Sequence, residues 1–170
     1  GSCEMPEITE TTQKHTVDVV FNATDAQSQI EACEARIDGM YYPTLENAID
    51  SAQIRKNKPI VTLLNNVEVE STLSVDESAE FTIQSEGYDA NASEDGVKYQ
   101  IKGTSNSNNL FEIVGKLAIH DLILANGSHG IYVDGGELIA NEIEVKDSVG
   151  KGIYIKGGKA KISGLTVNDA

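Results

Sequence analysis

The chain has 170 residues, 39% of them hydrophobic, and its formal net charge is −14. This length suits one domain, or one domain with a small appendage, and no apolar run approaches the roughly 18 residues of a membrane-spanning helix. The acidic excess lies in residues 1–97, with 19 acids against five bases, so this half lacks the clustered Lys and Arg that binding to nucleic acid phosphates requires.

The front of the chain is predicted to hold a tether and one strand. Residues 1–14 are polar and have no periodicity, which is typical of a flexible tether. Val17, Val19 and Phe21 follow with the period of two that predicts a strand. We divide the chain into this tether, an N-terminal unit at 15–58, and a repeat region at 59–170.

The two cysteines, Cys3 and Cys33, are too few and too far apart to form a zinc site. Ser2-Cys3 followed by acidic residues resembles the mature end of a bacterial lipoprotein, whose first cysteine carries the lipid. A free thiol at Cys3 and a disulfide with Cys33 are the alternatives. Lipidation at Cys3 is the only route by which we expect this chain to reach a membrane.

A hairpin and a helix are predicted before the repeats. Asp38-Gly39 separates the apolar triplets at 35–37 and 40–42, which is a stronger signal for a hairpin than the helical spacing that extends from residue 24. Thr44 is the expected N-cap of a helix that ends near Arg55–Lys58, before Pro59. Its apolar stripe consists of Leu45, Ala48, Ile49 and Ala52. We expect this helix to cover the open first coil of the repeat region, whose unpaired strand edge and apolar interior would otherwise face water.

From residue 61 onward, apolar-x-apolar triplets recur between polar or glycine-containing corners. The last third of the chain has a period of about 20 to 22 residues, and a polar loop at Ser85–Val97 interrupts the earlier part. This repeat predicts an all-β parallel β-helix, or solenoid. The triplets begin at Val61, Val67, Leu73, Phe81, Tyr99, Phe111, Leu122, Ile131, Ile143, Ile153 and Leu165.

Stacked coils place equivalent residues above one another at about 4.8 Å. The expected interior stacks are Phe111 with Ile131 and Ile153, and Ile113 with Val133 and Ile155. Glycines that follow these triplets are expected to turn one corner with positive φ: Gly115, Gly135 and Gly157. Residues that tolerate the left-handed region are expected at the opposite corner: Asn126, Asp147 and Asp169. No capping element follows the last triplet, so we expect the natural chain to continue beyond Ala170.

The N-terminal unit also carries a resemblance. Residues 34–52, with Tyr42-Pro-Thr-Leu-Glu-Asn-Ala-Ile-Asp-Ser-Ala52, and then Val61-Thr-Leu-Leu-Asn-Asn-Val67, resemble a segment of bacterial surface proteins. In those proteins it opens a pectate-lyase-like right-handed parallel β-helix. The resemblance extends over residues 34–170. It implies a right-handed β-helix with an N-terminal hairpin and a capping α-helix, and a protein that is secreted or held at the cell surface or outer membrane.

The residues do not suggest the chemistry of the lyases with this fold, which use aspartates around calcium and an Arg or Lys base. The two arginines precede the coils. The aspartates of the repeat region, Asp121, Asp134 and Asp147, occupy different positions in their coils. We therefore expect no catalytic residue, no metal site and no cofactor.

Two further sets of residues have side chains of a catalytic type. Glu142 and Glu144 flank the inward Ile143 and point outward, as a glycosidase pair would, but a solvated strand face is the simpler interpretation. His120 and His129 have no Ser or Cys partner in a triad-like context.

Tyr132 and Tyr154 are the candidate ligand-binding residues. They point outward at equivalent positions of successive coils, and exposed aromatic rings can bind the faces of sugars. The alternative is an aromatic ladder that stabilises the sheet by roughly 0.2–1 kcal/mol per pair.

Three functions are consistent with these features. The first is a non-catalytic surface module, adhesin-like or glycan-contacting, whose partner is a surface glycan or a host or bacterial surface protein. The second is the N-terminal part of a polysaccharide lyase or glycoside hydrolase. The third is a structural spacer.

Overall fold

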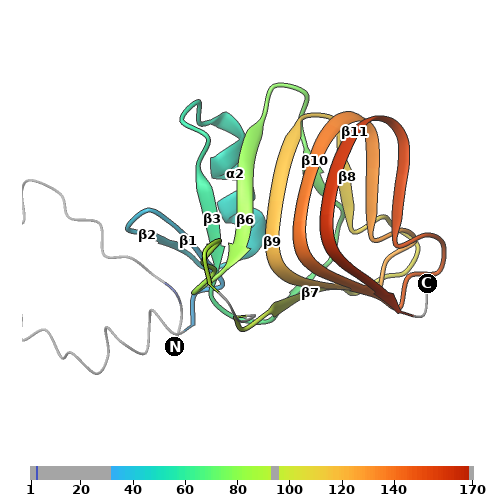
Figure 1. Cartoon of the computed structure of the whole chain (residues 1–170). Helices are drawn as coiled ribbons and strands as arrows, with labels where there is room; N and C mark the ends of the chain where they lie inside the picture. Colours follow the sequence, from blue (N-terminus) through green and yellow to red (C-terminus); the bar gives the residue numbers. More distant parts are fainter. Residues whose placement is uncertain (1–2, 4–31, 93–95, 169–170) are drawn as a thin grey trace, which may run out of the picture.

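The structure is a computed structural model that describes Cys3 and residues 32–92 and 96–168. The expected strand at Val17–Phe21, the expected tether apart from Cys3, and Asp169 lie outside these residues. The described part is mostly β, has a single helix, and forms a solenoid of about five stacked turns (Figure 1). The expected parallel β-helix with an N-terminal hairpin and helix is confirmed.

The hairpin closes the N-terminal end of the solenoid. Strands β1 (Ala35–Ile37) and β2 (Met40–Tyr42) pair antiparallel around a turn in which Asp38 has a φ of 52°. β1 also pairs antiparallel with β3 (Ile60–Leu63), the first strand of the coils. The hairpin therefore covers the backbone edge that the first coil would otherwise leave open.

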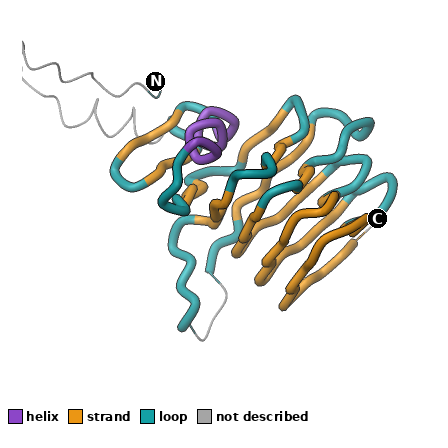
Figure 2. The backbone as a smooth tube through the Cα atoms, turned by 90° about the horizontal axis from the view of Figure 1, so that it is seen from above, coloured by secondary structure: helices purple, strands orange, loops and turns teal. Residues whose placement is uncertain are grey.

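Helix α2 (Leu45–Ile54) covers the interior of the first coils. The Thr44 Oγ1 accepts a hydrogen bond from the backbone N–H of Asn47 at 3.2 Å, which confirms the N-cap. The backbone N–H of Arg55 closes the last turn by donating to the Ala52 carbonyl. The predicted apolar stripe is buried, and the helix contacts β1, β3, β4, β5 and β6. Figures 1 and 2 show it at the N-terminal end of the stack.

Three parallel ladders form the faces of the solenoid, and their coils are stacked in Figure 2. The first ladder runs through β3, β6 (Glu80–Ser85), β9 (Lys116–Ala125), β10 (Ile131–Lys146) and β11 (Ile153–Asn168). The second begins with β4 (Val67–Val69) and β7 (Tyr99–Gly103) and continues through the C-terminal parts of the three long strands. The third begins with β5 (Leu73–Val75) and β8 (Phe111–Ile113) and continues through the first residues of β10 and β11.

The interior stacks are those that the repeat predicts. Ile131 pairs with Phe111 on one side and with Ile153 on the other, and Val133 pairs in the same way with Ile113 and Ile155. The members of these stacks in the inner coils, Phe111, Ile113, Ile131 and Val133, are fully buried, whereas Ile155 in the last described coil is 43% exposed. Packing between coils, together with the backbone ladders, therefore holds the fold together.

The backbone conformations predicted for the corners are confirmed only in part. Asn126 and Asp147 are left-handed, with φ values of 61° and 56°, as expected. Of the three corner glycines, only Gly135 has the predicted positive φ, at 85°. The prediction was wrong for Gly115 and Gly157, for two different physical reasons.

Gly115 is needed for close approach rather than for its backbone angle, because a Cβ there would collide with the carbonyl oxygen of Asp76. A shift in register between β10 and β11 moves Gly157 out of the corner position that Gly135 occupies. Asp134 pairs with Gly157, so Gly158 takes the position that follows, equivalent to Gly135 in the preceding coil. Gly158 accordingly has the positive φ, at 99°.

Candidate functional site

The tyrosine face, which we define as His129, Tyr132, Lys151 and Tyr154, lies on the third ladder and its adjoining corner. Tyr132 and Tyr154 pair in register, and their ring centroids are 5.3 Å apart with an interplanar angle of 46°. The His129 ring joins them from the corner that precedes β10, 5.4 Å from the Tyr154 ring and 6.2 Å from the Tyr132 ring. The predicted contact between the tyrosines is therefore confirmed, and a third ring extends it.

Hydrogen bonds fix the His129 ring in this position. The backbone N–H of Lys151 donates to its Nδ1 at 2.8 Å, and its own backbone N–H donates to the Oδ1 of Asn109 at 3.2 Å. Because Nδ1 accepts a hydrogen bond, the proton of the neutral ring is on Nε2. No pattern along the chain indicates this role, because His129 approaches the tyrosines only through the stacking of two corner loops.

Charged groups flank the rings. The Lys151 Nζ lies 4.3 Å from the centroid of the Tyr154 ring, within the range of a cation–π contact. On the other side, Glu112 pairs with Tyr132 in the ladder and accepts a hydrogen bond from the Asn109 Nδ2 at 3.0 Å. The face thus combines half-buried aromatic rings with an ammonium group and a carboxylate, which is a surface suited to polar ligands with an apolar side.

The structure does not assemble the glutamate pair on one strand face. Glu142 is left-handed, with a φ of 56°, at the corner between the first and second ladders, whereas Glu144 belongs to the second ladder. Glu142 lies 3.9 Å from the Nζ of Lys98, and Glu144 accepts a hydrogen bond from Asn168 at 3.2 Å. The two carboxylates therefore have separate partners, as structural surface residues do.

Cys3 forms a disulfide with Cys33, and the Cα atoms are 4.8 Å apart. This is one of the two alternatives to lipidation that the sequence leaves open. A sulfur held in a disulfide cannot carry a lipid at the same time, so the disulfide-bonded form has no lipid at Cys3.

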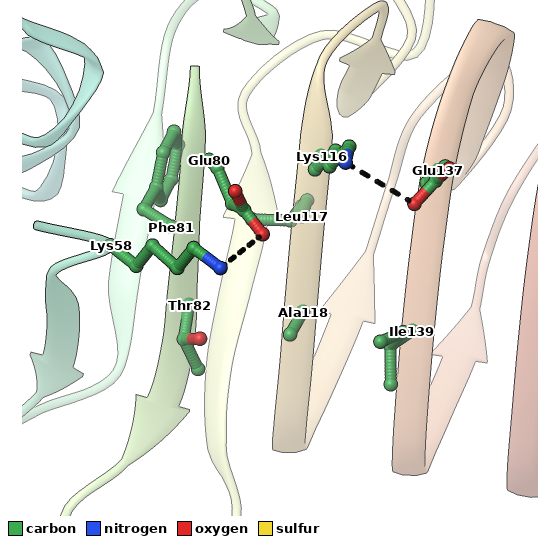
Figure 3. Close-up of a pocket in the computed structure, with 9 residues that line it drawn as sticks. All are labelled: Lys58, Glu80, Phe81, Thr82, Lys116, Leu117, Ala118, Glu137 and Ile139. Atoms are coloured by element: carbon green, nitrogen blue, oxygen red, sulfur yellow. Dashed lines mark ion pairs between the residues drawn. The ribbon is translucent and has the colours of Figure 1, made fainter. Parts of the chain in front are cut away.

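A small hollow lies on the outward face of the first ladder (Figure 3). Its volume is about 120 Å³, and Ala118 leaves room for it between larger neighbours. Two ion pairs lie along it, Lys58–Glu80 at 3.6 Å and Lys116–Glu137 at 3.9 Å. Small-molecule sites usually enclose roughly 300–1,000 Å³, so this hollow is too small to serve as one. Its charges form an alternating row along the ladder, which supports the register of the strands.

A larger cavity of about 400 Å³, which no sequence motif indicates, lies under the loop that follows β6; we call it the loop pocket. Its lining combines loop residues with corner residues of two later coils: Tyr88, Asp89, Ala90, Ala92, Asp121, Asn141 and Glu142. The loop belongs to the polar segment predicted at Ser85–Val97, and Figure 2 shows its described residues projecting from the stack. The residues that line the pocket come from the loop and from two later coils, so the sequence does not indicate a pocket before the coils are stacked.

An aromatic stack forms one side of the region around the loop pocket. The Tyr88 ring lies flat on the His120 ring, with centroids 4.4 Å apart and an interplanar angle of 3°. The Asn141 Nδ2 is 3.0 Å from the His120 Nδ1. Burial lowers the pKa of His120, although the Asp121 carboxylate opposes this effect. Burial also raises the pKa of Tyr88, with Asp121 and Asp89 adding to the shift.

The ends of the loop are pinned to the solenoid. The buried Ser85 hydroxyl donates to the Asp121 carbonyl at 2.5 Å and accepts from the Tyr99 backbone N–H at 3.0 Å. Arg36 on the hairpin contacts Glu86 at the start of the loop at 2.8 Å. These contacts join the two ends of the loop at the corner, next to the loop pocket.

Comparison with protein-family models, curated proteins and solved structures found no match to this chain. Within the described residues, no group of three or more His, Cys, Asp or Glu side chains is arranged to hold a metal ion. In the same part of the chain, no helix has the length and apolar character needed to cross a membrane.

Proposed function

We propose that this chain is a non-catalytic β-helix module that contacts a glycan through its tyrosine face. The observation that carries the proposal is the group of three aromatic rings, from β10, β11 and a corner loop, that pack side by side on an outward surface. Sugars present an apolar C–H face that can stack on such rings, while their hydroxyl groups need polar partners at the rim.

The rings are held in place before any ligand arrives. Tyr132 and Tyr154 support each other, and His129 is fixed by two hydrogen bonds. Tyrosine supplies a large contact area at a low cost in side-chain entropy, and preorganisation lowers that cost further. Lys151 over the Tyr154 ring, and Glu112 beside Tyr132 in the ladder, are the polar groups that we propose to hydrogen-bond the hydroxyl groups of a stacked sugar.

The proposed location is the cell surface or the extracellular space, and the proposed relatives are the bacterial surface proteins with pectate-lyase-like β-helices. The resemblance of residues 34–67 supports both. The Cys3–Cys33 disulfide adds independent support, because structural disulfides persist mainly in oxidising compartments. It favours a secreted or otherwise attached protein over a lipid anchor at Cys3.

A glycan array tests the proposal by comparing the wild-type chain with a Tyr132→Ala/Tyr154→Ala double variant. We expect the alanine variant to lose at least about tenfold in affinity, equivalent to about 1.4 kcal/mol. A Tyr132→Phe/Tyr154→Phe variant is the matched control, because it keeps both rings and should retain most of the binding. Thermal unfolding of all three proteins checks that the fold is intact.

The other candidate functions predict different results. If the tyrosines serve only as a structural ladder, no glycan binds and the alanine variant loses stability alone. Binding that the alanine variant retains in full would remove the tyrosines from the site. Release of unsaturated or reducing sugars by the wild-type chain would overturn the non-catalytic part of the proposal.

A further inference from the structure

The tyrosine face is built from two rows of side chains that run across three successive coils. The corner row stands two residues before the strands of the third ladder, which pair in register, and consists of Asn109, His129 and Lys151. The strand row follows three residues later in each coil and consists of Glu112, Tyr132 and Tyr154. Contacts along and between these rows therefore decide how the rings are held.

Within the corner row, side chains accept hydrogen bonds from the backbone of the next coil. The Asn109 Oδ1 accepts from the His129 N–H at 3.2 Å, and the His129 Nδ1 accepts from the Lys151 N–H at 2.8 Å. Backbone hydrogen bonds join the same corners, from the Leu110 N–H to the His129 carbonyl and from the Gly130 N–H to the Lys151 carbonyl. The side chain in one coil thus helps to set the position of the corner in the next.

The Asn109 carboxamide also contacts the strand row. Its Nδ2 donates to the Glu112 Oε1 at 3.0 Å, while its Oδ1 holds the His129 N–H. Only this orientation of the amide matches both partners, because the reversed one would place an NH₂ group against an N–H and an oxygen against a carboxylate. One side chain therefore joins the two polar neighbours of Tyr132.

The following coil holds the His129 ring from its other side. A Cβ at Gly150 would lie 2.5 Å from the Cε1 and 2.6 Å from the Nδ1 of that ring, which is closer than side-chain atoms approach. The Gly150 N–H donates to the Ser128 carbonyl at 2.6 Å, which fixes the glycine at this distance. His129 is thus held by Asn109 in the preceding coil and by the backbone of Gly150 and Lys151 in the following one.

We propose that Asn109 is the positioning residue of the tyrosine face. Its carboxamide holds the His129 ring beside the tyrosines and binds one oxygen of Glu112, so that the second oxygen, Oε2, is the one presented to a sugar hydroxyl group. Preorganisation of this kind raises affinity because less entropy is lost on binding. The role in binding rests on the proposed function, whereas the position of the ring can be measured without any ligand.

NMR spectroscopy of the free chain tests the positioning directly. The chain has three histidines, and the signals that disappear in a His129→Gln variant identify the His129 ring. In the wild type we expect nuclear Overhauser contacts from this ring to the rings of Tyr132 and Tyr154, whose centroids are 6.2 and 5.4 Å away. Asn109→Ala and Asn109→Asp should weaken these contacts. The first removes both hydrogen bonds, and the second places a carboxylate against that of Glu112.

A double variant separates positioning from a general effect on the fold. In Asn109→Asp/Glu112→Gln, the amide at position 112 can donate to the carboxylate at position 109, which restores the pair with donor and acceptor exchanged. We expect the wild-type ring contacts to return. Asn108→Asp is the matched control, because it adds the same charge at the neighbouring, exposed residue and should leave the ring contacts unchanged.

The glycan array measures the consequence for binding. Half-maximal signal should require about three- to tenfold more Asn109→Asp than wild-type protein, and no more Asn108→Asp than wild type. Gly150→Ala should displace the His129 ring from the opposite side and weaken binding in the same way. If the wild type binds no glycan, the proposed function fails, and the NMR contacts still decide whether Asn109 positions the ring.

Two results would overturn the positioning role. The first is a set of ring contacts that stays unchanged in both Asn109→Ala and Asn109→Asp, and the second is a double variant that does not restore them. If circular dichroism shows that a single variant has lost the solenoid fold, the double variant decides alone. Ring contacts that weaken while the array signal of a folded Asn109→Asp stays at the wild-type level would overturn the role in binding.

Discussion

Substitution of Val133 by aspartate tests the packing on which the fold depends. Val133 has no exposed surface, and it lies between Ile113 in the preceding coil and Ile155 in the following one. Aspartate at this position would place a carboxyl group between two aliphatic side chains. The surrounding interior is composed of apolar residues, so the new group would have no side-chain donor within its own stack.

The expected cost follows from two effects. Loss of a fully buried valine side chain from the core forfeits about 1.5–3 kcal/mol. Burial of a polar group without a hydrogen-bond partner adds about 1–3 kcal/mol even if the carboxyl takes up a proton. The total of about 2.5–6 kcal/mol is a large part of the roughly 5–15 kcal/mol by which a typical domain is stable. Because burial of an ionised carboxyl is more costly, the loss in free energy of unfolding caused by Val133→Asp should grow as the pH rises.

Urea unfolding followed by circular dichroism measures this difference. The matched control is Val114→Asp, because Val114 is also a valine of this part of the solenoid but is 44% exposed. That substitution should change the free energy of unfolding by about 0.5 kcal/mol or less. If Val133→Asp lies within about 1 kcal/mol of this control, Val133 does not face the interior and the coil register is wrong.

Three further changes have defined expected results. Gly115→Ala should cost about 1–3 kcal/mol in the same unfolding assay, because its Cβ meets backbone, whereas Gly39→Ala has open space; equal effects would contradict this close approach. Burial raises the pKa of the Glu46 carboxyl, and neighbouring acids add to the shift, so the ionised form destabilises the fold above the raised pKa. Glu46→Gln should therefore raise the free energy of unfolding at pH 7, by no more than about 1 kcal/mol after solvent screening. This stabilisation should disappear as the pH falls below about 4.3, where the carboxyl is protonated in both the folded and the unfolded chain. Stabilisation that persists at low pH would refute this cause. Titration of the unreduced, denatured protein should find no free thiol at Cys3 or Cys33, whereas membrane partitioning that Cys3→Ala abolishes would establish the lipid anchor instead.

Much of the architecture follows from local sequence because a solenoid repeats one local unit. The alternation in each triplet decides which side chains point inward, and the repeat length decides which residues meet in adjacent coils. Val133 can therefore be placed in the interior, and Tyr132 on the surface, from the repeat alone. Helix α2 is equally predictable, since its N-cap and apolar stripe are contiguous in the chain.

The corners show where this reasoning fails. The spacing of the glycines suggests that Gly115, Gly135 and Gly157 share one conformation, but the register shift beside Asp134 transfers the positive φ to Gly158. Gly115 is glycine because of a carbonyl from another coil. Neither effect is visible in the repeat itself, because both depend on atoms that approach across coils.

The sequence by itself determined the stacked β-helix, its inward and outward residues and the contact between Tyr132 and Tyr154, because all of these depend on period and alternation along the chain. Only the tertiary structure decided the rest. It joined Cys3 to Cys33, brought His129 to the tyrosines and placed Tyr88 over His120 to form the loop pocket. These residues come from irregular loops and corners, where no periodic signal exists and the position of each side chain is set by the coils packed against it.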